Sequence, residues 1–302
     1  MTRFLITGEG FPAFTVLKAA QELPSASISA FIPGSSSSVK AKAFAESHGI
    51  SVLSRSMLSG KEPFPTDLRA DWLVNINGTT IIAPGVIDMF AGRSLNMHPG
   101  LLPKYAGLHC HQWAIRNSES VQGLTVHVMD KGVDTGAVLA QQTIPILATD
   151  TGLSLFKRTM EQGAQLLIDV LKRIVANDIP QGTPQDLRQR TLYRHKDALN
   201  GEVDWRWSAR KICDFVRAAN YEPLVCPTYT PTASVSGERL VLRSCQISSF
   251  PGCAEQGTLV LDASNRPVVA CGDQEGIVIT RALRDNKVVT PDDWQMLAGS
   301  NR

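Results

Sequence analysis

The sequence has little excess charge, few aromatic residues and no long apolar run. Its 302 residues include 30 Lys and Arg against 28 Asp and Glu, which leaves a formal net charge of +2. A balanced chain has no bulk electrostatic field that draws it to nucleic acid or to an anionic membrane. No apolar stretch approaches the roughly 18 residues of a membrane span, and the N-terminus shows no signal region. We therefore expect a cytoplasmic protein without membrane contact.

Paired cysteine motifs are also missing. The six cysteines are scattered and none has C-x-x-C spacing, so the sequence predicts neither a structural zinc site nor a disulfide framework. Reduced thiols are typical of the cytosol. With 43% hydrophobic and 19% charged residues, the chain has the profile of an ordinary globular protein, and its length favours two domains.

The first third of the chain alternates between strand and helix patterns. Apolar or β-branched runs at 3–7, 27–33 and 51–54 are separated by amphipathic stretches that predict helices, the second of them over 39–49. The run at 71–77 is almost wholly apolar, as expected for a strand whose two faces are covered by helices. A short helix from Pro84 and a strand over 94–97 follow. This order predicts a parallel sheet.

The pattern then changes twice. Residues 123–130 and 137–146 predict an antiparallel pair joined by a turn, and 153–176 predicts a long helix over the sheet. A polar stretch precedes a helix at 208–219 and several short strand-like runs, which favour a small barrel because closure removes exposed edges. We predict an α/β fold: a Rossmann-like N-terminal domain with a mostly parallel sheet (1–182), a linker (183–204) and an OB-like C-terminal β-barrel domain (205–302).

The densest polar stretch, SLNMHPGLLPKYAGLHCHQW at 94–113, follows a predicted strand. Asn96 and His98 are two residues apart, so in an extended segment their side chains face the same side. Asp134 lies in the turn of the neighbouring hairpin. An amide and an imidazole can stabilise an oxyanion while a carboxylate orients the imidazole or accepts a proton, a set that suits acyl transfer. Because no Ser or Cys has a nucleophile-elbow surround, direct attack by the acceptor is favoured over an acyl-enzyme.

These motifs resemble those of the 10-formyltetrahydrofolate-dependent formyltransferases, which act on glycinamide ribonucleotide, methionyl-tRNA and amino sugars. Residues 96–103 (NMHPGLLP), followed by Tyr105-Ala106-Gly107, are similar to the Asn-x-His loop and the Leu-Leu-Pro segment of that family. Residues 123–127 (GLTVH) and 133–136 (VDTG) resemble the block that supplies its aspartate. Residues 201–205 (GEVDW) look like the linker and the start of the C-terminal barrel in the methionyl-tRNA and amino-sugar branches.

The resemblance implies a catalytic triad of Asn96, His98 and Asp134, with 10-formyltetrahydrofolate as co-substrate. Asn96 and His98 would stabilise the tetrahedral oxyanion, and Asp134 would hold His98 and relay the proton of the acceptor amine. The implied cofactor-binding residues are Asn75, Ile76, Asn77, Gly78, Ile81, Ile82, Leu102, Val133 and Gly136. The expected substrate-binding residues are Gly8, Gly10, Phe11, Pro99, Tyr105 and His111.

Simpler interpretations compete at several positions. Asn96 and Asp134 alone would be turn residues, and the Gly8-x-Gly10 spacing fits a tight β–α turn better than a phosphate loop. His109 and His111 have H-x-H spacing, but formyl transfer needs no metal, and in an extended segment Cys110 would point away from both; we predict no metal site. His127 is either a hydrogen-bonded structural histidine or part of the site wall.

The acceptor is expected to be a small molecule rather than tRNA. Methionyl-tRNA enzymes carry a basic insertion after the second strand, whereas residues 33–38 (PGSSSS) are short and uncharged here, and Ala106 replaces an arginine. We expect a nucleotide-linked amino sugar, or an amino acid or carrier-bound amino group. A methionyl-tRNA formyltransferase and a 10-formyltetrahydrofolate hydrolase stay open as alternatives. A carrier protein and a homodimer are compatible with the sequence.

Overall fold

The computed structural model describes residues 1–250 and 252–299, and the chain forms two compact units. The N-terminal unit comprises residues 1–107, 121–145 and 157–192, and the C-terminal unit comprises 108–120, 146–156 and 193–302. The predicted domain limits at 182 and 204 stay a prediction, and the last residues of the predicted 205–302 domain, 300–302, lie outside the described part. No helix within that part has the length and apolar character to cross a membrane.

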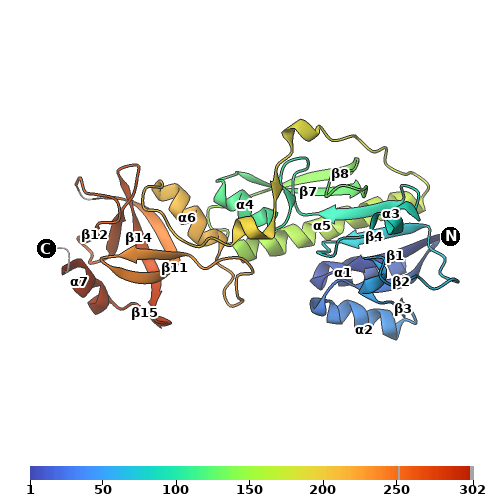
Figure 1. Ribbon diagram of the computed structural model, residues 1–302, viewed down its shortest axis with the longest axis horizontal. Coiled ribbons are helices and arrows are strands. Elements are labelled where there is room, and N and C mark those ends of the chain that lie inside the picture. Colours follow the sequence, from blue (N-terminus) through green and yellow to red (C-terminus); the bar gives the residue numbers. More distant parts are fainter. Residues whose placement is uncertain (251, 300–302) are drawn as a thin grey trace. The chain divides into compact units, whose positions relative to one another are not determined.

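The N-terminal unit is built on one seven-stranded sheet (Figure 1). Its strands follow the order β3-β2-β1-β4-β5-β7-β8, parallel from β3 to β5 and antiparallel from β5 to β8. Their bounds are β1 Thr2–Gly8, β2 Ala26–Pro33, β3 Ser51–Val52, β4 Trp72–Ile76, β5 Ser94–His98, β7 Val121–Val128 and β8 Val138–Pro145. The prediction of a mostly parallel sheet is confirmed. β4 and β5 are buried throughout, which explains their apolar sequences.

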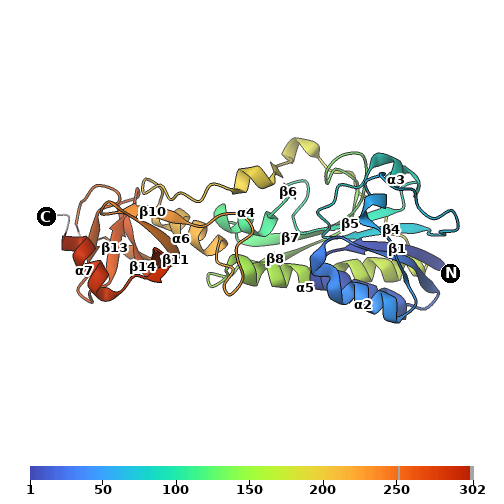
Figure 2. The same cartoon turned by 60° about the horizontal axis from the view of Figure 1, so that its bottom comes forward.

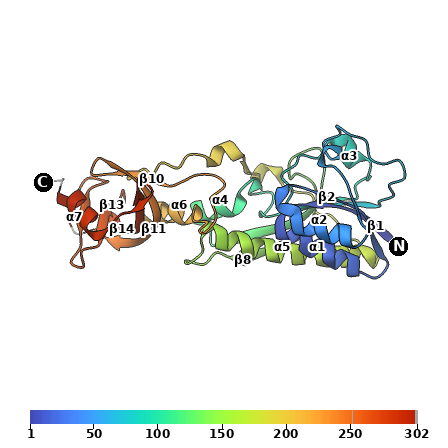
Figure 3. The same cartoon turned by 90° about the horizontal axis from the view of Figure 1, so that it is seen from below.

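Helices cover both faces of this sheet. Figures 2 and 3 show α1 (Gly10–Glu22), α2 (Val39–Ser47) and α5 (Gly152–Val175) along one face and α3 (Pro84–Asp88) on the other. α3 begins at Pro84, a residue suited to the first helical position. On α5, a Cβ at Gly163 would lie 2.8 Å from Met97 Sδ, so the missing side chain lets this helix lie directly against β5. Because side chains alternate along a strand, Asn96 and His98 face the opposite side from Met97.

The C-terminal unit contains a second, antiparallel sheet with the order β10-β11-β14-β13-β12, and β15 pairs with β14. β10 and β12 lie at opposite ends of this order, so the sheet is a half-barrel, which agrees with the predicted OB-like β-barrel domain. Its core joins Ile212 and Phe215 to Leu240 and Ile277. The strands are β10 Thr232–Val235, β11 Glu238–Ser249, β12 Leu259–Leu261, β13 Pro267–Ala270, β14 Glu275–Arg284 and β15 Lys287–Val288, and the helices are α4 Cys110–Arg116, α6 Ala209–Ala218 and α7 Pro291–Gly299.

The expectation of an extended segment around Cys110 is wrong. His109 takes a left-handed conformation (φ 58°) and α4 begins at Cys110. One left-handed residue turns the chain sharply, which the apolar pattern does not reveal. The argument that Cys110 points away from His109 and His111 because side chains alternate along a strand therefore no longer holds. The remaining short strands are β6 (Ala106–Gly107) and β9 (Leu192–Tyr193).

Candidate functional site

A row of polar side chains crosses three neighbouring strands of the N-terminal sheet. Asn75 on β4 pairs in register with Asn96 on β5, and Asn96 pairs with His127 on β7. Paired residues on adjacent strands point to the same face, so the three side chains stand side by side. They lie toward the carboxyl ends of β4 and β5, where open α/β sheets place their ligands.

Asn96, His98 and Asp134 converge as the sequence predicted. Asn96 Nδ2 lies 3.5 Å from Asp134 Oδ1, and His98 Nδ1 lies 3.5 Å from Asp134 Oδ2. Asn96 is 9% exposed and His98 is 3% exposed. The three side chains therefore lie together in a site that is largely shielded from solvent. Electrostatic interactions are stronger there than in water.

Asp134 is held by the backbone around it. Its φ of 56° is left-handed, a conformation that Asp and Asn tolerate better than most residues, and its Oδ2 accepts a 2.8 Å hydrogen bond from the N–H of Gly107. Burial alone would raise the pKa of Asp134, but the His98 and His127 imidazoles and the Gly107 N–H lower it, and the net pKa lies well below its usual range. The carboxylate is therefore ionised at neutral pH.

His98 is fixed by a main-chain oxygen. Its Nε2 lies 2.7 Å from the carbonyl oxygen of Tyr105, and because a carbonyl only accepts, Nε2 carries a proton. Burial lowers the pKa of His98, and the Asp134 carboxylate opposes this only in part. At neutral pH a neutral imidazole thus faces an ionised carboxylate, which explains why the Nδ1–Oδ2 distance is longer than a hydrogen bond. A proton that reaches Nδ1 would be stabilised between them.

His127 is a fourth member that the sequence left undecided. Its Nδ1 donates to the carbonyl oxygen of Val128 (2.8 Å), and its Nε2 lies 3.1 Å from Asn96 Nδ2 and 3.5 Å from Asp134 Oδ1. His127 is thus both hydrogen-bonded and part of the polar cluster. The only sign of His127 in the sequence was its place on a predicted strand with alternating side chains. Its contact with Asn96 depends on β7 pairing with β5, which the sequence pattern does not reveal.

The predicted cofactor-binding residues after β4 lie at the same end of the sheet. The Asn75 side chain is buried, and its Nδ2 donates to Asn96 Oδ1 (2.9 Å). The Asn77 N–H donates to the Met97 carbonyl (3.3 Å), and Ile76 is fully buried. Ile81 is 79% exposed, whereas Ile82 is buried in the core beneath α3. Gly78 lies directly against the Asn75 amide.

The other predicted cofactor-binding residues lie in the loop after β5 and in the turn between β7 and β8. Val133 is 51% exposed and its carbonyl accepts from Arg190 (2.8 Å), while the Gly136 carbonyl accepts from Gln185 (2.6 Å). Leu102 is buried, with its N–H on Thr125 Oγ1 (3.3 Å). Beside this turn a pocket of about 460 Å³ opens between the end of α3 and Lys131-Gly132.

The predicted substrate-binding residues divide between the two units. Gly8 allows β1 and β4 to approach closely, since a Cβ there would lie 2.7 Å from Ile76 Cβ, and Gly10 starts α1 with a φ of 63°, as a tight β–α turn requires. Phe11 is partly exposed, and the Tyr105 N–H donates to Thr191 Oγ1 (2.8 Å). The Pro99 carbonyl accepts from Gln122 (2.7 Å).

His111 belongs to the C-terminal unit, where its Nε2 bonds to the hydroxyl of Tyr221. Burial lowers the pKa of His111 to about 3, so it is neutral. In residues 1–250 and 252–299 no cluster of three or more His, Cys, Asp or Glu side chains has the arrangement of a metal site.

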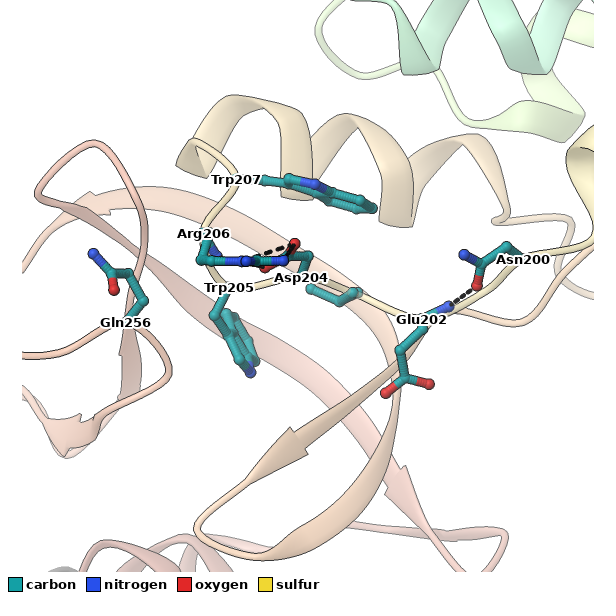
Figure 4. A pocket seen from close by; sticks show the side chains of 8 residues that line it. Asn200, Glu202, Asp204, Trp205, Arg206, Trp207 and Gln256 are labelled. Atoms are coloured by element: carbon teal, nitrogen blue, oxygen red, sulfur yellow. Dashed lines mark hydrogen bonds and ion pairs between the residues drawn. The ribbon is translucent and has the colours of Figure 1, made fainter.

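A second pocket, of about 530 Å³, lies in the C-terminal unit between Trp205, Trp207 and Gln256 (Figure 4). Its charged groups already have partners: Arg206 pairs with Asp204 (2.7 Å), and the Glu202 carboxylate accepts from Arg239 (2.9 Å). It contains none of the predicted site residues, and we assign no ligand to it.

Two family models and several known proteins match this chain. Residues 41–171 match the formyl transferase family and residues 197–297 match the formyl transferase C-terminal domain. A methionyl-tRNA formyltransferase of Stenotrophomonas maltophilia is 31% identical over 231 residues, which cover 76% of this chain and 72% of that protein. A GDP-perosamine N-formyltransferase of Brucella melitensis is 32% identical over 162 residues, covering 53% of this chain and 61% of the relative.

The fold is also that of a solved structure. The N-formyltransferase from Helicobacter canadensis, in complex with folinic acid and dTDP-3-aminofucose, has a TM-score of 0.70 at 20% identity and covers 92% of this chain and 99% of its own. The predicted resemblance is thus confirmed. The chain belongs to the formyl transferase family, whose members are N-formyltransferases that use 10-formyltetrahydrofolate.

Proposed function

We propose that this protein transfers the formyl group of 10-formyltetrahydrofolate to a primary amine of a small-molecule acceptor, namely a nucleotide-linked amino sugar or an amino acid or carrier-bound amino group. The observation that carries the proposal is the convergence of Asn96, His98 and Asp134 within 3.5 Å contacts. An amide donor, an imidazole and an ionised carboxylate are what an amine attack on a carbonyl carbon requires.

Each of the three side chains has a separate role in this proposal. Asn96 donates an N–H to the formyl oxygen as negative charge develops on it. His98 Nδ1 and Asp134 accept the proton that the acceptor amine loses, and His98 then carries a charge stabilised by Asp134 and by the Tyr105 carbonyl. One C–N bond forms to the acceptor and one breaks to N10 of the folate, which receives a proton in return.

The co-substrate supplies the electrophilic formyl carbon, and the turn between β7 and β8 is where we place its pterin. The pocket of about 460 Å³ beside Lys131-Gly132 has a volume in the range of small-molecule sites. Backbone groups of this turn can pair with the amide-like edge of a flat heterocycle. The Val133 and Gly136 carbonyls are already bonded to Arg190 and Gln185, which makes the turn rigid before any ligand arrives.

Two features support a small acceptor. One relative is a GDP-perosamine N-formyltransferase, and the Helicobacter canadensis structure is in complex with dTDP-3-aminofucose. In addition, the loop after β2 forms only a short 3₁₀ turn, Ser36–Ser38, without a basic residue that could meet tRNA phosphates. Methionyl-tRNA is the second candidate, because a methionyl-tRNA formyltransferase matches over most of both chains.

A competition among acceptors tests the proposal. The purified protein and 10-formyltetrahydrofolate are incubated with GDP-perosamine, dTDP-3-aminofucose, a panel of free diamino acids, or charged initiator tRNA, and N-formyl products are measured by mass spectrometry. Formylation of a small amine supports the proposal. Efficient formylation of the tRNA alone would select the second candidate, and formate release that no amine accelerates would indicate a hydrolase.

A further inference from the structure

The Asn96 amide belongs to a chain of hydrogen bonds whose direction is determined at one end. The Val128 carbonyl can only accept, so His127 Nδ1, 2.8 Å away, must donate to it. In a neutral imidazole the other nitrogen is then an acceptor. When His127 is neutral, its Nε2 therefore accepts from Asn96 Nδ2 at 3.1 Å, which places the NH₂ group of Asn96 on the His127 side.

The other end of the Asn96 amide meets Asn75. Asn96 Oδ1 accepts from Asn75 Nδ2 at 2.9 Å, and both side chains are buried. Of the two Nδ2 protons of Asn96, one is bound by His127 and the other faces Asp134 Oδ1 at 3.5 Å, a distance longer than a good hydrogen bond. The second N–H of Asn96 is held only weakly, so it is the one that can donate a hydrogen bond to a developing oxyanion.

The backbone leaves room for this arrangement only because residue 78 is glycine. A Cβ at Gly78 would overlap Asn75 Oδ1 and would come within 3.2 Å of Asn75 Nδ2. Side-chain atoms do not tolerate such approaches, so any other residue would displace the Asn75 amide.

We infer that Asn75 is a positioning residue that selects the orientation of the Asn96 amide. If Asn96 turned over, its Oδ1 would face the developing oxyanion and repel it. Asn75 donates to Asn96 Oδ1 and so favours the productive orientation over the reversed one. Gly78 provides the space for this contact. The inference rests on the proposed function, because it requires Asn96 to be the oxyanion donor.

Kinetics of two Asn75 variants test the inference, with the best acceptor of the panel above and GDP-perosamine as the first probe. Asn75→Leu removes the donor at similar size, and kcat should fall about threefold to tenfold with an unchanged KM for 10-formyltetrahydrofolate, as expected for the loss of one hydrogen bond. Asn75→Asp places an acceptor against Asn96 Oδ1 and should lower kcat about 100-fold at neutral pH. The control is Thr7→Val, at the position of β1 that pairs with Asn75. It removes a buried residue's hydroxyl that belongs to none of these hydrogen bonds, and it should leave kcat unchanged.

The pH profile distinguishes positioning from a merely structural role. Burial raises the pKa of a carboxyl group, and once the carboxyl group that Asn75→Asp introduces is protonated, it would again donate to Asn96 Oδ1. Turnover of Asn75→Asp relative to the native protein should therefore rise as the pH falls, whereas the relative turnover of Asn75→Leu should not. A constant ratio for both variants would overturn the inference.

A measurement that needs no acceptor completes the test. In protein labelled with ¹⁵N at asparagine, the side-chain amide signals of Asn96, identified by their absence in Asn96→Ala, should shift or broaden in Asn75→Leu and Gly78→Ala but not in Thr7→Val. Unchanged Asn96 signals would refute the inference even if a variant folds poorly in the assay. The proposed function fails instead if the native protein formylates no acceptor of the panel, whereas full turnover of Asn96→Ala would remove Asn96 from the mechanism and refute the inference with it, so the two failures can be told apart.

Discussion

Both units contain histidines removed from solvent, but only in the N-terminal unit do these histidines lie around a carboxylate. In the N-terminal unit His98 and His127 both lie 3.5 Å from Asp134. In the C-terminal unit His111 bonds to the Tyr221 hydroxyl, and His109 Nε2 lies 3.0 Å from His195 Nδ1. Within the described residues, neither of these C-terminal contacts includes a carboxylate.

This difference decides what a buried imidazole can do. Without an anion nearby, burial lowers the pKa of His111 to about 3 and that of His109 to about 4, so both remain neutral and cannot hold a proton during a reaction. Beside Asp134, a proton on His98 has a compensating charge. We therefore expect the chemistry in the N-terminal unit, and structural roles for the C-terminal histidines.

Replacing the Asp134 carboxylate should abolish this difference between the two units and cause the largest loss of turnover. Asp134→Asn keeps the size of the side chain and tolerates its left-handed backbone, but it removes the negative charge. We expect kcat to fall by about 10³–10⁴, the upper range for general acid–base catalysis, while tetrahydrofolate binding stays largely intact. His98→Ala should behave similarly, and the double variant should lose little more. An equal loss of folate affinity would show that these residues bind rather than catalyse.

Removing the amide tests the second element of the N-terminal site. Asn96→Ala deletes one oxyanion donor, and the barrier should rise by about 2.7–4 kcal/mol, which lowers kcat about 10²–10³-fold. Steady-state kinetics with saturating 10-formyltetrahydrofolate measure this loss. Turnover equal to that of the native protein would remove Asn96 from the mechanism.

The C-terminal histidines should affect stability rather than catalysis. The folded-state pKa of His111 is about 3 against an ordinary 6.5, so between these values the unfolded chain binds a proton that the folded chain does not. Stability attributable to His111 is therefore lost as the pH falls from about 6.5 toward 3, at up to about 1.4 kcal/mol per pH unit.

Replacing His111 by a residue that does not titrate makes its contribution to the acid dependence of stability measurable. His111→Gln should weaken the acid dependence of the free energy of unfolding, measured by urea titration at several pH values. Equal slopes for the native protein and His111→Gln would contradict the assignment.

The smallest effect is expected at His109. Asparagine tolerates the left-handed conformation that residue 109 adopts, and the contact with His195 is partly solvated. His109→Asn should change the free energy of unfolding by no more than about 0.5 kcal/mol and leave kcat within about twofold. A loss as large as that of Asn96→Ala would place His109 in the active site.

Local patterns predicted the longer strands and most helices of the molecule, because apolar periodicity is a local property. They did not predict the short strands β6, β9, β10 and β15 or the helices α4 and α7. The triad could be predicted because its motifs resemble a family. The roles of Asn75 and His127 could not, because their hydrogen bonds depend on β4 and β7 lying on either side of β5, a non-local arrangement that no stretch of sequence encodes.

The side chains of Asn75, Asn96 and His127 form a row because β4, β5 and β7 pair in register. Adding or deleting a single residue within β4, β5 or β7 would turn the following side chains to the opposite face and break the row, even if the sheet still formed. Length variation compatible with activity should therefore be confined to the connecting loops. Under the proposed function, the register of these three strands contributes to catalysis as much as any one side chain does.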